Sequence, residues 1–400
     1  MKVIHTFTVP ISLCFLENQS SFWDTNQYNL HVLSSEHGGL LKEFGQKNRL
    51  TTFAIPFTRN KDILQSLSNV RMLYAYFRKH RPTLVHGNTP KAAFLSMMAA
   101  TFARVPVRVY EMHGLPLETA RWPWKLFYWG IEKMTCALAT HVIAVSPSLR
   151  QSAIQKRLIS AQKISVMHHG SCNGVDAKQK FNPACIDVQK VENLRKKWNL
   201  NPAQPIVGFV GRLTPDKGIQ ELYDAWQWVK QVVPAAKLLM VGDCDDRQPI
   251  SHRLLSQLEH DASIIHLNHQ SDIASVYALI DFLVLPSHRE GLGNVVLEAA
   301  AMSKPAVVSN VTGLKDAVDD NRTGTFCAPR SAQDLAAKMI AYLQNPPLVQ
   351  QHGQAAQLRI RKRFVPEDVW HAKLMLYRRL VAATESVTLP HVPTIFQTAD

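Results

Sequence analysis

The chain has 400 residues and a formal charge of +14 at pH 7, from 45 lysines and arginines against 31 aspartates and glutamates. An apolar content of 46% excludes a disordered chain, and the length exceeds what one hydrophobic core supports, so two domains are expected. The positive charge favours a phosphorylated substrate or an anionic membrane surface as partner, whereas the absence of RNP, zinc-finger and helix-turn-helix motifs argues against nucleic acid.

The first predicted element is a buried strand at 2–9. A signal peptide is the less favoured alternative, because His5 and Pro10 interrupt the apolar run and no small-residue cleavage site follows. No apolar run reaches the roughly 18–20 residues that cross a bilayer, so no spanning helix is expected. The six cysteines form no CxxC pair and no metal-spaced cluster, and they are expected to be buried, reduced thiols in the cytoplasm.

Runs rich in β-branched residues alternate with segments of helical apolar spacing along the rest of the first half. Strands are predicted at 29–35, 51–57, 83–87, 107–112, 141–146 and 164–168, and helices at 62–80 and 90–103. This alternation predicts a parallel sheet that is covered by helices on both faces.

The alternation stops at 171–204, where turn residues, a short basic helix at 188–199 and the punctuation "NPAQP" follow one another. It resumes with the strand in "PIVGFVGRL" (205–213). Further strands are predicted at 237–241, 263–267, 282–286 and 305–310, and the last helix at 366–383. The tail from 386 is polar and contains prolines, so it is expected to be loose.

The chain is therefore predicted to hold two doubly wound α/β domains. Two such domains leave a cleft between them, and ligands bind where the carboxyl ends of the strands open. The boundaries are an N-terminal domain at 1–180, a linker at 181–204, a C-terminal domain at 205–365, a C-terminal helix at 366–385 and a tail at 386–400.

In "VGFVGRLTPDKGIQEL" (207–222), a strand runs into a helix through a turn. Thr214 suits the N-cap and Pro215 the first helical position, which places Lys217 in the first turn of the helix. A cation is unfavourable there unless it shares a bound anion with the helix N–H groups. Arg212 is close enough in sequence to reach the same anion. A solvated turn with two surface cations is the alternative.

"HREGLGNVVLEAAA" (288–301) repeats this pattern of strand, glycine turn and helix. Gly291 and Gly293 permit close backbone approach, and Asn294 begins the helix. Glu298 falls about one turn into it, where a carboxylate could hold a ribose. Glu290 precedes the turn and would face the other end of a nucleotide-linked sugar. Alternatively, Glu290 is a helix-start acid and Glu298 a surface residue.

Two further candidates follow strands of the first half. His113 follows "VYEM" at the carboxyl edge of the predicted sheet, although a lone histidine is more often structural than catalytic. Lys91 lies in the first turn of another predicted helix, where an anion could bind, although a surface lysine is the simpler interpretation.

Together these segments resemble the retaining glycosyltransferases of family 4. The resemblance is carried by "GFVGRLTPDKG" (208–218), by "PSHREGLGNVVLEA" (286–299) with its Glu-x7-Glu pattern, and by "SNVTGLKDAV" (309–318). It covers almost the whole chain. "VHGNTPKAAFLSMMAA", "VPVRVYEMHGLP", "HVIAVSPSLR" and "GSCNGVD" resemble the branch that builds capsule, O-antigen and other surface polysaccharides. The family resemblance implies the GT-B fold. In this fold two Rossmann-like doubly wound domains face each other across a cleft, and the C-terminal helix crosses back to the N-terminal domain.

The resemblance also implies site roles. Arg212 and Lys217 neutralise the donor diphosphate, Glu298 holds the ribose, and His113 contacts the donor sugar from the opposite domain. The donor sugar and phosphate are held by Glu290 and the backbone of the turn, which comprises Gly291, Leu292, Gly293, Asn294 and Val295. Weaker candidates for acceptor or phosphate contact are Pro10, Ile11 and Lys91.

The chemistry implied is same-face attack on an ion pair, with cations stabilising the leaving diphosphate. No carboxylate acts as a nucleophile, unlike in a retaining glycosidase. "DCDD" (243–246) matches a DxD metal motif by letters, but the family does not use that motif, so neither an essential metal nor a cofactor is expected.

Two departures from the family pattern concern the first half and the linker. The phenylalanine that commonly lies four residues after the Asp of NGVD lies five after it here, at Phe181. Pro10–Ile11–Ser12 replaces the Gly-Gly pair of the first loop, and the pair Gly38–Gly39 follows the second strand instead. The resemblance therefore leaves the role of the first loop open.

The implied donor is a nucleotide sugar, with UDP the base choice, and the implied acceptor is a sugar on undecaprenyl diphosphate. "ARWPWKLFYWGIEKM" (120–134) combines aromatic and basic residues that could lie on the inner face of the cytoplasmic membrane, or pack as a core helix. A GT-B nucleotide-sugar epimerase and a non-catalytic nucleotide-sugar or polysaccharide-binding subunit are the alternatives.

Overall fold

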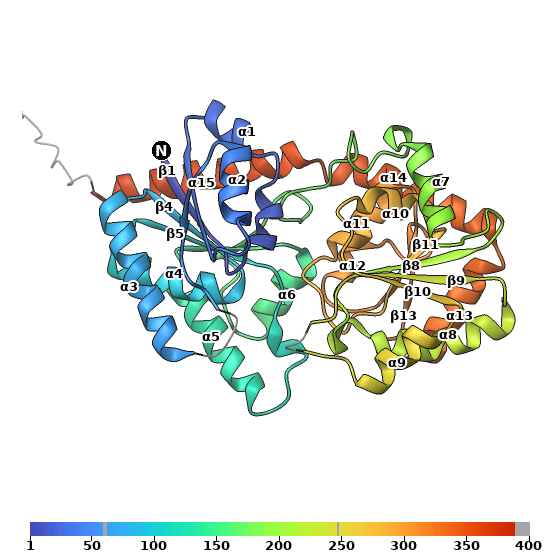
Figure 1. Cartoon of the computed structure of the whole chain (residues 1–400). Helices are drawn as coiled ribbons and strands as arrows, with labels where there is room; N and C mark the ends of the chain where they lie inside the picture. Colours follow the sequence, from blue (N-terminus) through green and yellow to red (C-terminus); the bar gives the residue numbers. More distant parts are fainter. Residues whose placement is uncertain (59–61, 246–247, 389–400) are drawn as a thin grey trace, which may run out of the picture. The chain divides into compact units, whose positions relative to one another are not determined.

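The computed structural model describes residues 1–58, 62–245 and 248–388 and contains two parallel sheets (Figure 1). The first has seven strands in the order β3-β2-β1-β4-β5-β6-β7, and the second has six in the order β10-β9-β8-β11-β12-β13. In each sheet the chain first adds strands on one side and then reverses to the other. This reversal marks the switch point of a doubly wound fold, so the predicted fold class is confirmed.

The first sheet is built from elements that follow the predicted alternation. Its strands are β1 (Lys2–Thr6), β2 (Asn29–Ser34), β3 (Thr51–Ala54), β4 (Leu84–Asn88), β5 (Val107–Met112), β6 (His141–Ala144) and β7 (Ile164–Val166). The helices between them are η1 (Pro10–Leu16), α1 (Ser20–Thr25), α2 (Leu40–Asn48), α3 (Ile63–His80), α4 (Pro90–Phe102), η2 (Pro116–Glu118), α5 (Trp124–Leu138) and α6 (Pro147–Gln155).

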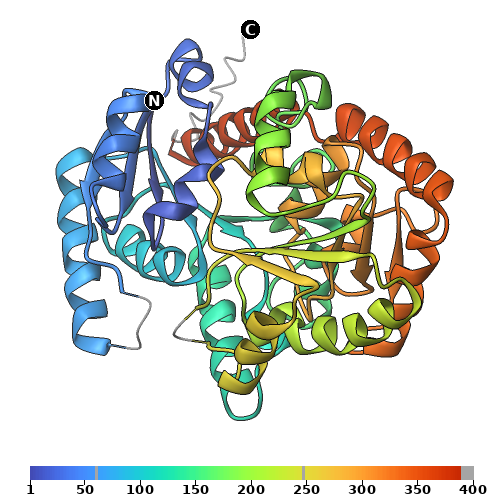
Figure 2. The ribbon, with the colours of Figure 1, turned by 45° about the vertical axis from the view of Figure 1, so that its right-hand side comes forward.

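The second sheet follows η3 (Pro183–Cys185) and α7 (Val188–Lys197). Its strands are β8 (Ile206–Val210), β9 (Lys237–Val241), β10 (Ile264–Leu267), β11 (Phe282–Leu285), β12 (Ala306–Ser309) and β13 (Gly324–Cys327). Its helices are η4 (Pro215–Lys217), α8 (Ile219–Val232), α9 (His252–His260), α10 (Ile273–Leu279), α11 (Asn294–Ala301), α12 (Leu314–Ala317), α13 (Ala332–Leu343) and α14 (Pro346–Arg363), and α15 (Pro366–Thr388) follows them. In Figures 1 and 2, α8 and α9 lie on one face of this sheet, and α10 and α11 lie on the other.

Chain contacts divide the molecule into two compact units. One comprises Met1–Glu111, Ile131–Ile143 and the chain from Trp370, and the other comprises Met112–Gly130 and Ala144–Val369. The last helix, α15, therefore begins in the second unit and continues in the first. Within the first unit α15 packs on α1, where the ring of Tyr377 stacks on that of Trp23 at a centroid distance of 5.4 Å. The helix returns to the first sheet as the family resemblance implies.

Several elements differ from the sequence predictions for local reasons. β13 was not predicted, because "GTFC" is short and begins with glycine. The first strand ends at Thr6 instead of 9, because Pro10 begins the 3-10 helix η1. The predicted loose tail is helical to Thr388, and the rest of it lies outside the described residues.

The cysteines are less uniformly buried than predicted. Cys136, Cys172 and Cys327 are buried, but Cys14, Cys185 and Cys244 are exposed, and none of the six is in a disulfide. Within the described ranges, no helix is both long and apolar enough to cross a membrane.

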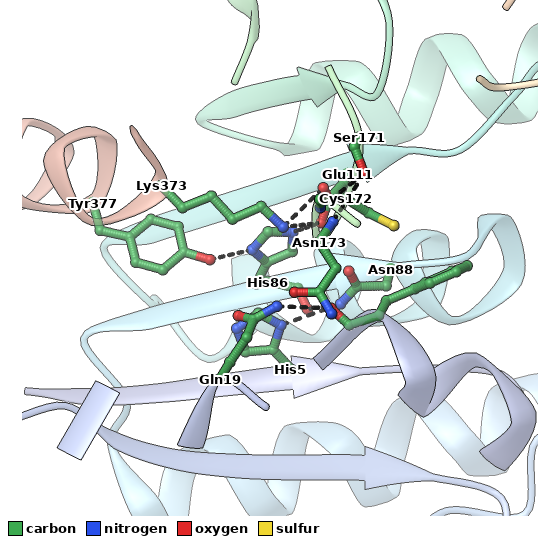
Figure 3. Close-up of polar contacts among 12 residues, drawn as sticks. His5, Gln19, His86, Asn88, Glu111, Ser171, Cys172, Asn173, Lys373 and Tyr377 are labelled. Carbon is green, nitrogen blue, oxygen red and sulfur yellow. Dashed lines mark hydrogen bonds and ion pairs between the residues drawn. The ribbon is translucent and has the colours of Figure 1, made fainter. Parts of the chain in front are cut away.

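The first unit holds a buried polar cluster beneath α15 (Figure 3). Lys373 Nζ lies 2.9 and 3.0 Å from the two carboxylate oxygens of Glu111, and His86 Nε2 lies 3.0 Å from the same group. The Tyr377 hydroxyl is bonded to His86 Nδ1, and the rings of His5 and His86 stack 4.6 Å apart. Burial lowers the pKa of both histidines, so they are neutral at pH 7.

A second buried carboxylate, Glu132 in α5, accepts a 2.9 Å hydrogen bond from Tyr110. Burial raises its pKa from 4.5 to about 7. Between these values the folded state holds a proton that the unfolded state has released, so the contribution of Glu132 to stability falls as the pH rises from 4.5 to 7.

Replacing Glu132 by glutamine is therefore expected to stabilise the protein more at pH 8 than at pH 5.5, by roughly 2 kcal/mol. The amide keeps an oxygen for Tyr110 but cannot ionise. Unfolding midpoints of wild type and Glu132→Gln, followed across this range, measure the difference. A gain that does not depend on pH would contradict the assignment.

Candidate functional site

The predicted donor residues lie at the switch point of the second sheet. Arg212 follows β8, and the turn from Ser287 to Gly293 follows β11. These two strands pair directly, with Phe282 opposite Val207. The carboxyl ends of parallel neighbours meet at one edge, which brings the two turns together at the place where doubly wound folds bind ligands.

Lys217 occupies a different local structure from the one predicted. Pro215–Lys217 forms the 3-10 turn η4, and α8 begins only at Ile219, after Gly218 in the left-handed region with φ +71°. Lys217 therefore precedes the α-helix instead of lying in its first turn. A Cβ on Gly218 would lie 2.2 Å from the carbonyl oxygen of Pro286, so only glycine lets η4 pack this close to the end of β11.

The close packing joins Lys217 to Glu290. Lys217 Nζ donates to Glu290 Oε1, and Ser287 Oγ donates to the same oxygen at 2.9 Å. The lysine and glutamate side chains are only 19% and 14% exposed. The structure thus brings together two of the four side chains proposed as catalytic, and the sequence did not predict that they pair.

A second ion pair runs beside the first with its charges reversed. Arg289 Nη2 lies 3.0 Å from Asp216 Oδ2, so residues 216 and 217 pair with 289 and 290 in turn. Burial alone would raise the pKa of Asp216, but a hydrogen bond from Thr214 and the charge of Arg289 outweigh it and lower that pKa. Together the two pairs are electrically neutral.

Arg212 pairs with a different carboxylate from Lys217. Its guanidinium donates to Asp245, which is buried and follows β9. In the sequence, "DCDD" suggests only a doubtful metal motif, and nothing there predicts Asp245 as the partner of Arg212. The pairing of β8 with β9 brings the two residues together. The sequence of one strand does not show which strand pairs with it, so this contact could not be predicted.

The glycine turn packs against the loop that carries His113, within the same unit. A Cβ on Gly291 would lie 2.2 Å from the His113 carbonyl oxygen, and Ser146 Oγ donates to the Gly291 carbonyl at 2.7 Å. Gly293 has φ +78°, and a side chain there would meet Leu314. The close approach that the glycines permit is thus to the protein's own chain. Leu292 is buried beneath the turn, and Val295 is half-buried at the start of α11.

Glu298 lies in α11, which begins at Asn294, as predicted. Its Oε2 accepts a 2.9 Å hydrogen bond from the hydroxyl of Tyr277 in α10. Tyr277 is fully buried, and burial together with the Glu298 charge raises its pKa well above the usual value. Tyr277 holds the carboxylate in place, which makes it a second residue that sequence reasoning missed.

The weaker candidates Pro10, Ile11 and Lys91 lie in the first unit. Pro10 is buried at the start of η1, and Ile11 is 63% exposed. Lys91 is the second residue of α4, and burial lowers its pKa. The N–H group of Ala92 already donates to Thr8 Oγ1 at 3.2 Å, which leaves fewer amides at this helix start for an anion.

The aromatic and basic segment 120–134 is interpreted from its sequence either as a membrane-facing surface or as a core helix, and its two halves differ in exposure. Its first half is exposed, with Trp122 81%, Leu126 63% and Phe127 46% accessible. In its second half Glu132 is buried but Met134 is 50% exposed, and α5 continues into the buried residues Thr135 and Cys136. Among the described residues, no group of three or more His, Cys, Asp or Glu side chains could hold a metal ion.

Two family models match the chain, one for each half. "Glycosyltransferase Family 4" matches residues 16–177, and "Glycosyl transferases group 1" matches residues 190–359. The chain is 29% identical over 384 residues to the capsular polysaccharide biosynthesis glycosyltransferase CapM of Staphylococcus aureus, which covers 96% of this chain and 98% of that protein.

A second relative is the UDP-Gal:α-D-GlcNAc-diphosphoundecaprenol α-1,3-galactosyltransferase of Escherichia coli, with 27% identity over 72% of this chain and 73% of that protein. Among solved structures, Anabaena HepE in complex with UDP-glucose has a TM-score of 0.74 at 22% identity, covering 97% of this chain and all of that one. This structural likeness extends over both sheets.

Proposed function

The chain belongs to the GT-B glycosyltransferases, and we propose that it is a retaining, metal-independent enzyme that moves a hexose or N-acetylhexosamine from a UDP-sugar to a lipid-linked sugar. The observation that carries the proposal is the juxtaposition of Lys217 and Glu290 at the switch point of the second sheet. A cation and a carboxylate side by side suit the phosphate and the sugar hydroxyls of one donor.

The proposed roles follow from where charge develops. As the bond from the sugar C1 to the phosphate oxygen breaks, its electron pair passes to the diphosphate. Lys217 and Arg212 stabilise that charge, once each has exchanged its carboxylate partner for phosphate. Glu298, oriented by Tyr277, accepts hydrogen bonds from the ribose. Glu290 binds sugar hydroxyls, the backbone of Gly291–Val295 binds phosphate, and His113 contacts the sugar.

Same-face attack by the acceptor hydroxyl, whose proton passes to the departing phosphate oxygen, keeps the anomeric configuration without a covalent sugar–enzyme bond. We assign Glu290 to binding of the sugar hydroxyls and not to nucleophilic attack, because same-face attack needs no enzyme carboxylate as nucleophile, unlike a retaining glycosidase. The two cations supply leaving-group stabilisation that a divalent metal supplies in other enzymes.

The acceptor proposal draws on the relatives. Proteins named for capsule synthesis and for transfer to a diphosphoundecaprenol-linked sugar match along most of the chain. We therefore place this enzyme on the cytoplasmic face of the membrane, extending a polyprenyl-diphosphate-linked sugar during assembly of a surface polysaccharide. The acceptor candidates Pro10, Ile11 and Lys91 belong to this part of the proposal.

The test is a donor screen that measures UDP release with lipid extract as acceptor. One UDP-sugar is expected to release UDP only when extract is present, with the sugar recovered in the lipid fraction and its linkage retained on NMR. Release of an epimerised UDP-sugar without acceptor would favour an epimerase. Binding of a UDP-sugar without turnover in any extract would favour a non-catalytic subunit.

Membrane association is expected through the exposed half of the aromatic segment. Trp122 and Leu126 present apolar area, and Arg121 and Lys125 add positive charge beside it. Such a surface binds the interface of an anionic bilayer. The protein should pellet with anionic liposomes, be released by salt, and bind several-fold more weakly after Trp122→Ser.

A matched control is Trp228→Ser, because Trp228 is also exposed (45%) but lies on α8 in another part of the chain. It should pellet like the wild type. Equal binding to neutral liposomes, or binding that salt does not reduce, would rule out the electrostatic contribution.

A further inference from the structure

We propose that Arg289 and Thr119 are positioning residues that hold the His113 loop in register with the donor turn. The proposal rests on the proposed function, because it concerns the rate of the transfer step at that same site. The His113 loop is defined here as residues 113–119, which follow β5 and contain η2. All of these residues belong to the second compact unit.

One end of the loop is fixed by backbone packing. The His113 carbonyl lies so near Gly291 that a Cβ on Gly291 would come within 2.2 Å of it. At Gly114, with φ +139°, an added Cβ would be 3.6 Å from the Gly291 nitrogen. This end of the loop therefore touches the turn through main-chain atoms, and its position depends on where the rest of the loop is held.

The other end is fixed by side chains. Arg289 Nε donates to Thr119 Oγ1 at 2.9 Å, while its Nη2 lies 3.0 Å from Asp216. One guanidinium thus reaches the His113 loop, the 3-10 turn that contains Lys217, and the turn that contains Glu290. The fixed fork of arginine permits this double engagement, whereas the ammonium of lysine is a single point charge.

A neighbouring set of contacts supports the same end. Glu118 Oε1 accepts from Ser152 Oγ at 2.6 Å, from Lys156 Nζ at 3.2 Å and from Thr312 Oγ1 at 3.2 Å. Because Glu118 remains held when Thr119 is changed, loss of the Thr119 hydroxyl should shift the loop without unfolding it.

The consequence concerns His113. The loop is held at 113–114 by the glycine turn and at 118–119 by side chains. We infer that these contacts fix the position of His113 relative to Glu290. Reaction rates depend steeply on such placement, whereas the proposed contacts of the UDP part of the donor, with the cations and Glu298, do not use the loop.

The experiment compares Thr119→Val, which removes only the hydroxyl acceptor, with Thr119→Ser, which keeps it. Thr119→Val is expected to lower kcat about tenfold while the Kd for UDP changes less than twofold. Thr119→Ser is expected to match the wild type. On an Arg289→Lys background, Thr119→Val should add less than a twofold loss, because both changes break the same contact.

Amide hydrogen exchange gives a readout that needs no turnover. Exchange at 114–119 should rise in Thr119→Val and not in Thr119→Ser. The positioning role would be overturned if Thr119→Val had the same kcat and the same amide exchange as the wild type. It would also be overturned if the affinity for UDP fell in parallel with kcat. If the wild type transfers no sugar, the proposed function fails, and unchanged exchange in Thr119→Val would separately refute the contact's role in holding the loop.

Discussion

Replacing Lys373 by methionine is expected to lower the free energy of unfolding by about 3–5 kcal/mol, which is the usual loss when one partner of a buried ion pair is removed. Lys373 and Glu111 are each only 1% exposed. Methionine fills much of the lysine volume but leaves the Glu111 carboxylate charged and without its cation. The measurement is urea unfolding followed by tryptophan fluorescence, since Trp23 stacks on Tyr377 one turn along the same helix.

The double variant Lys373→Met/Glu111→Gln separates this cause from lost packing. With both charges removed, no buried charge remains unpaired, so the double variant should be more stable than Lys373→Met alone. An exposed pair, Glu367 at the start of the same helix with Lys178 at 3.1 Å, serves as comparison. Lys178→Met is expected to cost less than about 1 kcal/mol. A double variant as unstable as the sum of its singles would contradict the charge argument.

The second large effect is expected in catalysis. Lys217→Ala should lower the rate of sugar transfer by about 10²–10³-fold, because it removes a fixed cation from the leaving diphosphate. Glu290→Ala should also be severely impaired, through loss of the sugar contact. Initial rates of UDP release at saturating donor measure both changes.

Lys230→Ala is the matched control for Lys217→Ala. Lys230 also pairs with a carboxylate, Asp261 at 2.7 Å, and lies on α8, which follows η4. Its variant should keep transfer within about twofold of the wild type, as expected for a pair remote from the chemistry. Near-wild-type transfer by both Lys217→Ala and Glu290→Ala would mean that the reaction occurs elsewhere on the protein.

Much of the fold followed from the sequence because its signals are local. Within the described part of the chain, alternating β-branched runs and helical spacing located every strand except β13. Pro90 at the start of α4 and Asp62 as the N-cap of α3 explain why those helix starts were close to prediction. The strand–glycine turn–helix pattern likewise placed Glu290 in the turn and Glu298 in α11.

The missing parts of the site depend on contacts between distant segments. Asp245 meets Arg212 because β9 lies beside β8, and Arg289 meets Thr119 across 170 residues of chain. Lys373 and Glu111 are 262 residues apart and come together only when α15 packs on the first sheet. In the sequence each is an ordinary polar or charged residue, and no spacing rule joins it to its partner.

In the two ion pairs formed by residues 216 and 217 with residues 289 and 290, each proposed donor-binding side chain already has a partner within the protein. A donor must therefore compete with these internal contacts. An anion that binds Lys217 competes with the Glu290 carboxylate, and orthophosphate brings no sugar hydroxyl groups to bind that carboxylate in place of the lysine. A nucleotide sugar brings hydroxyl groups that can satisfy Glu290 as it leaves the lysine. We therefore expect selection at this site to work by exchange, so that orthophosphate competes poorly with a complete sugar nucleotide.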